Sequence, residues 1–105
     1  MRAGDLDQWI TIETPSAASD ELGQDGLTWL FLEGRAAKVI EEQGREFLKG
    51  GYRAEEKAVF VVRWGEFDST MRVLWGGRTW RVTSVTGTMR EGWIWLHCIA
   101  SEGPN

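Results

Sequence analysis

Cysteine and histidine are scarce in this sequence: Cys98 and His97 are the single examples of each among 105 residues. One cysteine excludes an intrachain disulfide framework, so packing or assembly must stabilise the fold, and it fits a reducing compartment. Because the two residues are adjacent, on a strand their side chains point to opposite faces and cannot form a nucleophile–base pair. We expect Cys98 to fill the core and His97 to be an ordinary surface or interface residue.

Signatures of metal and phosphate binding are also missing. No Cys-x-x-Cys or His-x-x-x-His spacing supplies the ligands of a metal site. Gly50-Gly51 lacks the Gly-Lys-Ser/Thr ending of a phosphate-binding loop. The acidic pairs Glu41/Glu42 and Glu55/Glu56 are typical of a solvated face. We predict that the protein is not an enzyme and has no metal and no cofactor.

The chain has neither a long apolar run nor an excess of basic residues. No run approaches the roughly 18 apolar residues of a membrane span, so we expect no membrane partner. The opening residues, MRAGDLDQW, lack the apolar segment of a secretory signal, so the chain is expected in the cytoplasm when it is made. A net charge of −4 argues against a generic nucleic-acid binder.

The clearest local signal is the stretch MRVLWGGRTWRVTSV, residues 71–85. Gly76-Gly77 joins two alternating runs, which predicts a tight β-hairpin. Met71, Val73 and Trp75 share one face of the first arm, and Trp80 and Val82 share one face of the second. We expect Trp75 and Trp80 to pair across the strands in a structural role.

Further strand patterns surround this hairpin in a single domain of residues 1–105. Alternation at 9–14 predicts a half-buried strand that Pro15 ends, and 28–40 is a longer strand with a bulge at Gly34. Residues 58–64 are apolar on both faces, as in a central strand, and 93–100 form the last strand. Six such runs without a long helix predict an all-β fold, a barrel or a sandwich, of which the barrel is favoured because closure removes free edges.

Residues 41–57, EEQGREFLKGGYRAEEK, lack a clear period and mix both signs of charge. We predict a long flexible loop here, with a short helical turn around 45–49, and a frayed tail at 101–105.

Seven tryptophans are many for a chain of this length. Trp93 and Trp95 share the row of the last strand opposite Leu96 and Cys98. That row is either a binding surface or a second packed face.

Charged residues are also unevenly distributed along the chain. Residues 1–26 contain six acidic residues against Arg2, whereas residues 69–90 contain Arg72, Arg78, Arg81 and Arg90 and no acidic residue.

An ordered set of short motifs along nearly the whole chain resembles the phage head-tail joining family, the head-closure or stopper proteins of tailed phages and gene transfer agents. The motifs are Gly4-Asp5-Leu6, Trp9-Ile10-Thr11-Ile12, Leu22-Gly23-Gln24, Thr28-Trp29, Ala36-Ala37-Lys38-Val39, Gly44-Arg45-Glu46-Phe47, Met71-Arg72-Val73, Gly77-Arg78-Thr79-Trp80-Arg81-Val82, Val85 and Leu96-His97-Cys98. Trp64, Trp93 and Trp95 depart from the family pattern, and we assign them to a partner surface.

The resemblance implies a virion protein: a small barrel with a long loop between its second and third strands. Copies would form a sixfold or twelvefold ring below the portal and adaptor, dock a tail terminator or tail tube protein, and keep packaged DNA from leaking. The implied channel loop contains Gly44, Arg45, Glu46, Phe47, Gly50 and Gly51. Such a loop can switch between ordered and disordered states as neighbours dock.

The charge polarity suggests how a ring would assemble. Head-to-tail contacts join different patches of one subunit, so we hypothesise that Asp20, Glu21 or Asp25 of one copy approaches Arg72, Arg78 or Arg81 of the next. Two alternatives remain open: an OB-like module for single-stranded nucleic acid, with the arginines and exposed tryptophans as its platform, and a tail terminator ring.

Overall fold

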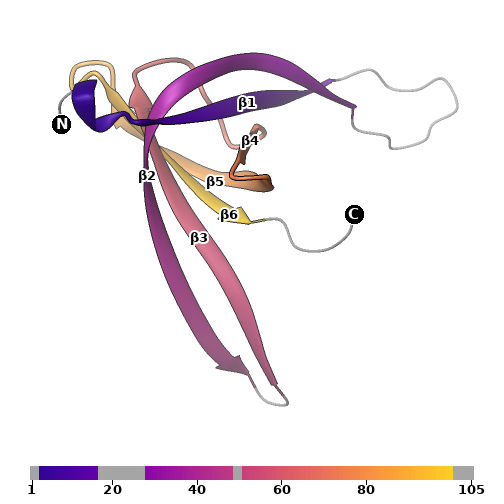
Figure 1. Ribbon diagram of the computed structural model, residues 1–105. Helices are drawn as coiled ribbons and strands as arrows, with labels where there is room; N and C mark the ends of the chain where they lie inside the picture. Colours follow the sequence, from indigo (N-terminus) through magenta and orange to yellow (C-terminus); the bar gives the residue numbers. More distant parts are fainter. Residues whose placement is uncertain (1–2, 17–27, 49–50, 101–105) are drawn as a thin grey trace, which may run out of the picture.

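A computed structural model describes the backbone of residues 3–16, 28–48 and 51–100, and the side chains of residues 4–16, 28–41 and 56–100. A short 3-10 helix, η1 (Ala3–Asp5), precedes the strands (Figure 1). The strands are β1 (Gln8–Ser16), β2 (Thr28–Leu48), β3 (Gly51–Arg63), β4 (Arg72–Trp75), β5 (Arg78–Thr88) and β6 (Trp93–Ala100). No helix in this described part is long and apolar enough to cross a lipid bilayer.

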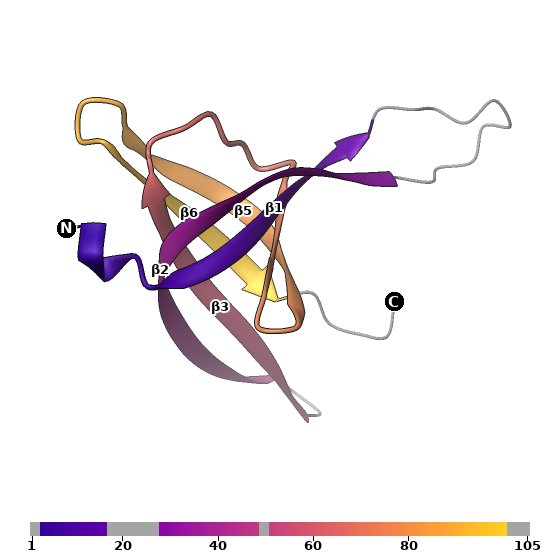
Figure 2. The ribbon, with the colours of Figure 1, turned by 45° about the horizontal axis from the view of Figure 1, so that its top comes forward.

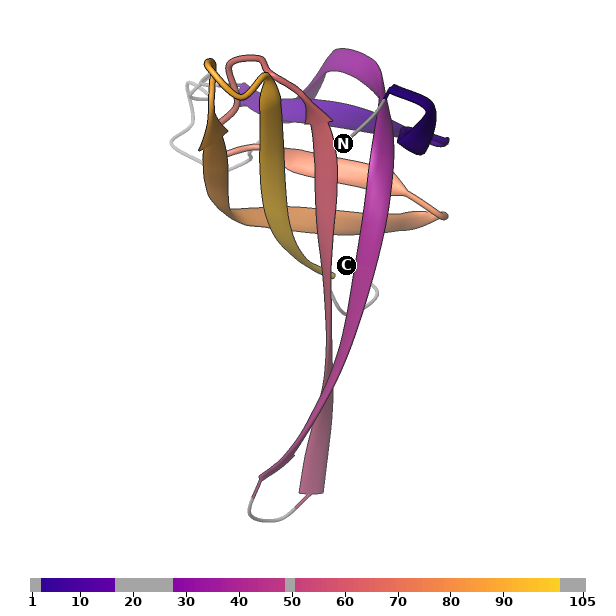
Figure 3. The ribbon, with the colours of Figure 1, turned by 90° about the vertical axis from the view of Figure 1, so that its left-hand side faces the viewer.

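The six strands form a closed antiparallel barrel in the order β1-β2-β3-β6-β5-β4. The predicted all-β barrel is therefore confirmed. Closure depends on a short ladder between β1 and β4, from Thr11 opposite Leu74 to Glu13 opposite Arg72. Seen from the side, β3 and β6 cross in front of β1, β4 and the first part of β5, whose end bends to run beside β6 (Figure 3). β3 lies between β2 and β6, as its two apolar faces predict.

The predicted hairpin is formed by β4 and β5. Gly76 and Gly77 make its two-residue turn with φ values of 62° and 75°. Positive φ at both central residues is the type I′ geometry, whose twist matches that of the flanking strands. The turn aligns Val73 with Trp80, so both side chains enter the barrel.

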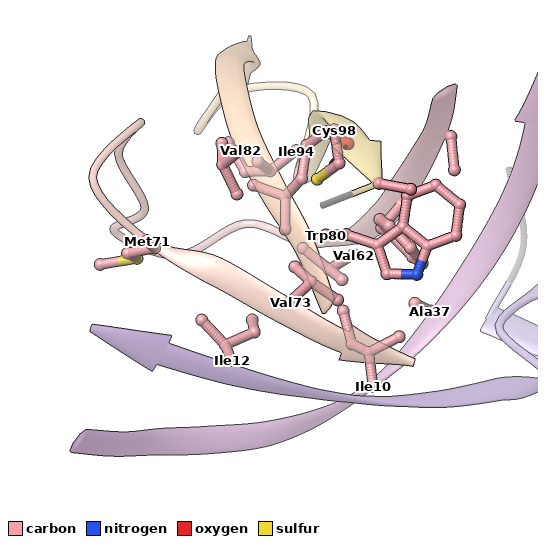
Figure 4. Close-up of a cluster of buried hydrophobic side chains, with 14 residues drawn as sticks. Ile10, Ile12, Ala37, Val62, Met71, Val73, Trp80, Val82, Ile94 and Cys98 are labelled. Carbon is pink, nitrogen blue, oxygen red and sulfur yellow. Dashed lines mark hydrogen bonds between the residues drawn. The ribbon is translucent and has the colours of Figure 1, made fainter. Parts of the chain in front are cut away.

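Trp80 lies at the centre of the core and is 1% exposed. Its ring centroid is 5.7 Å from that of Phe60 and 6.1 Å from that of Trp75, and its Nε1 donates a hydrogen bond to the Trp75 carbonyl oxygen at 3.2 Å. The predicted structural pair of tryptophans is confirmed. Around it, residues from all six described strands converge, several of them labelled in Figure 4. They include Ile10, Ile12, Ala37, Val62, Met71, Val73, Val82, Ile94, Leu96, Cys98 and Ala100.

The prediction of a long loop at 41–57 is wrong. β2 continues to Leu48 and β3 begins at Gly51, and the two pair continuously from Glu41 opposite Ala58 to Leu48 opposite Gly51. The helical turn predicted around 45–49 is also absent from the described residues, because 45–48 belong to β2. Lys49 lies outside the described residues. This segment extends beyond the barrel core, so its side chains need not alternate between apolar and polar. Backbone hydrogen bonds pair its two strands, and the sequence therefore lacks the pattern by which a strand is predicted. Residues 101–105 also lie outside the described part.

Two predictions about the first strands also need correction. Pro15 does not end β1, which continues to Ser16 with Pro15 opposite Trp29. β1 has only β2 as a neighbour there, so the missing N–H can face away from the ladder. The bulge lies at Leu32 rather than Gly34, because Ile12 pairs with Glu33 and Glu13 with Phe31.

Candidate functional site

The β2–β3 ribbon, residues 42–48 and 51–56, projects from the barrel as two strands (Figure 3). β1 pairs with β2 only as far as Ala37, and β6 pairs with β3 only from Lys57. Within the described residues both outer edges of the ribbon are therefore unpaired. Four residues assigned to the channel loop lie on β2, with Gly44 opposite Glu55, Arg45 opposite Ala54, Glu46 opposite Arg53 and Phe47 opposite Tyr52. Gly51 begins β3, and Gly50 lies outside the described residues.

The arginines assigned to a ring contact have different surroundings. Arg72 Nε donates to Glu13 Oε1 at 2.6 Å, and its guanidinium lies 4.3 Å from the ring centroid of Trp29. Arg78 forms an ion pair with Glu56 and lies over Trp80. Arg81 is exposed and makes no ion pair with any described side chain. Of the three, Arg81 alone has no ion-pair partner among the described side chains.

The acidic residues of the proposed ring contact, Asp20, Glu21 and Asp25, belong to residues 17–27, which lie outside the described part of the chain.

The three tryptophans assigned to a partner surface have different surroundings. Trp64 packs against the edge of the core. Trp93 lies on the outside of β6, with the Arg63 guanidinium 5.5 Å from its ring centroid. Trp95 is also half-buried on the outside, opposite Val61.

Sequence reasoning missed a run of three exposed apolar side chains on β2. Leu30, Phe31 and Leu32 are 51%, 68% and 41% exposed. They belong to the β1–β2 lip, residues 14–16 and 28–32, which extends past the end of the barrel (Figure 2). The signal was the unbroken apolar run WLFL: it fits a buried strand, but here its last three residues are exposed on a two-stranded projection.

A hollow of about 230 Å³ lies on the outer side of β3, β5 and β6. Its lining residues are Lys57, Ala58, Val59, Thr83, His97, Cys98 and Ile99. Thr83 is left unpaired by a bulge in β5, and its Oγ donates to the His97 carbonyl oxygen at 3.0 Å. No cluster of three or more potential metal ligands occurs among the side chains that the structure describes.

The comparison that decides the family is a match to the phage head completion protein model over residues 1–103. The chain belongs to this family. Among curated proteins, none matches the chain. Among solved structures, a chain in the virion of a native gene transfer agent particle superposes with a TM-score of 0.65, at 22% identity over 90% of this chain and 91% of that one. This likeness supports the barrel fold.

Family membership confirms the resemblance found in the sequence. It makes the chain a structural virion protein that assembles with other head and tail proteins. The family is not one of known enzymes.

Proposed function

We propose that copies of this chain form a ring between the portal or adaptor and the tail, retain packaged DNA and present the surface on which the tail docks. The observation that carries this proposal is the β2–β3 ribbon on a closed barrel. Seven residues of β2, 42–48, correspond to a reach of roughly 23 Å at about 3.3 Å per residue. A ring of barrels would hold such ribbons in its channel.

The ribbon suits a gate because its two strands have no ladder partner except each other, and the ion pair between Glu56 and Arg78 holds only its base. A two-stranded hairpin is marginally stable in water, so contacts with DNA or a neighbouring protein can decide its position. Its sequence alternates in charge, with Arg45, Glu46, Arg53 and Glu55, which opposes uncontrolled pairing of its free edges. The acidic chain, with a net charge of −4, limits adhesion to phosphates, so DNA can slide past.

The ion pairs within the subunit reduce the number of arginines that we propose for the ring contact. Since Arg72 and Arg78 already hold Glu13 and Glu56, we assign the contact with the acidic residues Asp20, Glu21 and Asp25 of the next copy to Arg81. An ion pair between copies sets register and encounter rate more than affinity.

Shortening the ribbon tests the gate. Replacing residues 43–56 with a two-residue Asn-Gly turn keeps every barrel strand paired. We expect particles that incorporate the shortened chain but lose DNA, measured as the ratio of full to empty heads by electron microscopy. A normal share of full heads, with the variant present at wild-type level, would contradict the gate.

The alternatives make different predictions. A single-strand binding module would use pairs such as Arg63 over Trp93 and would bind oligonucleotides tightly in low salt as an isolated protein. A tail terminator would lie at the end of the tail tube, and we place the ring at the head because the family is one of head completion proteins.

A further inference from the structure

The β1–β2 lip is an apolar surface without a neighbour in the described part of the subunit. Beyond Glu13, β1 has no second partner strand, and the exposed side chains Leu30, Phe31 and Leu32 lie along the facing strand. Consecutive residues point to opposite faces, so the lip is apolar on both sides. A protruding apolar segment of this kind marks an interaction site.

The lip is held in a defined position. Trp29 lies under the Arg72 guanidinium, and Arg72 is fixed by its 2.6 Å hydrogen bond to Glu13. This arrangement ties the root of the lip to β4, the strand that closes the barrel. The exposed side chains are therefore presented on a fixed arm, which lowers the entropy lost on docking.

The hollow on β3, β5 and β6 complements the lip in polarity and charge. Val59 and Ile99 give it an apolar lining. Ile99 lies in register with Lys57 on one side and with Arg81 on the other, so two cations flank it. The chain segment that leads into the lip carries Asp20, Glu21 and Asp25 and no basic residue. An apolar arm that follows acidic sequence thus matches an apolar hollow with a basic rim.

We propose that the lip of one copy packs into the hollow of the next, with Phe31 as the central contact. This rests on the ring of the proposed function. The two surfaces lie on different sides of the barrel: β3 and β6 face the viewer in Figure 3, whereas β1 crosses behind them. A subunit cannot satisfy both surfaces by itself. Two different patches that bind each other between copies make a heterologous contact, which repeats around a ring until it closes.

Disulfide trapping in assembled particles tests this contact. Thr83 is exposed at the hollow, and Phe31 is exposed on the lip, so F31C and T83C report on both sides. The native Cys98 also lines the hollow, although it is 3% exposed, so all of these variants carry C98A. We expect F31C/T83C particles to give a ladder of covalent oligomers on a non-reducing gel. F31C alone, T83C alone and F31C/M89C, whose second site lies in the β5–β6 turn away from the hollow, should give monomers.

Three results would overturn the proposal: assembled F31C/T83C particles without a ladder, dimers from F31C alone, or a cross-link from F31C to another virion protein. If the double variant is not incorporated, F31D decides, with M89D as the equally exposed control. F31D should keep the wild-type circular dichroism and melting temperature but fall at least tenfold in particle incorporation, while M89D stays at the wild-type level. Normal incorporation of F31D would refute this contact alone, whereas wild-type chains located away from the head–tail junction would refute the ring.

Discussion

Gly34 lies beneath the indole of Trp9: a Cβ at residue 34 would come within 2.6 Å of Trp9 Cζ2. The two residues are diagonal neighbours on β1 and β2, since Trp9 pairs with Ala36 and Thr11 with Gly34. The aromatic ring therefore covers the backbone of a strand glycine. This contact explains why a residue with poor strand propensity occurs in β2.

The Trp9–Gly34 contact predicts a specific coupling. G34A should lower the free energy of unfolding by about 1 kcal/mol in the wild type, because the methyl group displaces the ring. In a W9A background the same change should be neutral or stabilising. A double-mutant cycle measured by urea denaturation checks this, and equal effects of G34A in both backgrounds would show that the ring does not matter.

The turn of the β4–β5 hairpin predicts a second effect. G76A or G77A places a Cβ at φ 62° or 75° and should cost about 1–2 kcal/mol each. Asparagine tolerates this conformation, so G77N should cost less than G77A. Equilibrium unfolding of the four chains, wild type included, provides the comparison. G4A, where an added Cβ meets no atom within 4 Å, is a control that should change little.

Trp80 predicts the largest loss of stability. W80A removes the central core side chain and should cost roughly 3–5 kcal/mol, a large share of the ~5–15 kcal/mol of a typical domain. W80F keeps an aromatic ring against Phe60 but loses the hydrogen bond from Nε1 to the Trp75 carbonyl oxygen. Its cost should be smaller, and thermal or chemical denaturation ranks the two. Equal losses for both variants would contradict the central role of the ring.

Burial raises the pKa of the Cys98 thiol to about 12 from an ordinary value of 9.0. The folded state therefore disfavours the thiolate, and this contribution to stability is complete below pH 9 and is lost as the pH rises toward 12. Relative to C98A, the wild type should lose about 1.4 kcal/mol of unfolding free energy per pH unit in that range. Denaturation curves of both proteins between pH 8 and pH 11 measure the difference, and a constant difference would contradict the buried thiol.

Arg81 predicts a salt-sensitive assembly step. R81E should reduce incorporation into particles, because it reverses the charge at the rim of the hollow, and added salt should narrow the gap from the wild type. R90E is the matched control, since Arg90 is also exposed but lies in the turn after β5. Quantitative gels of purified particles give the ratio. Wild-type levels of R81E at physiological salt would exclude the contact.

Strand patterns predicted most of the barrel, because its interior imposes a two-residue period. β6 alternates between buried and half-buried residues over its whole length, and the Gly76-Gly77 turn has one favoured geometry. The family could also be recognised from motifs in order. The strand pattern, the hairpin turn and the family motifs all depend on residues that are close together in the sequence.

The projection of the ribbon and of the lip beyond the barrel could not be predicted, and the reason is the same for both. Both extend beyond the barrel, where burial no longer sets a pattern, so the charged ribbon resembled a loop and the apolar lip resembled a core strand. Likewise, sequence alone did not show that Arg72 and Arg78 pair with Glu13 and Glu56, which lie on other strands. Long-range pairing decides which charges remain available for assembly.

Cryo-electron microscopy of intact particles tests the central claim most directly. We expect a ring of this chain between the portal or adaptor and the tail, with each β2–β3 ribbon directed into the channel and each lip in contact with the next barrel. Particles in which the chain lies elsewhere, or forms no ring at the head–tail junction, would contradict the account.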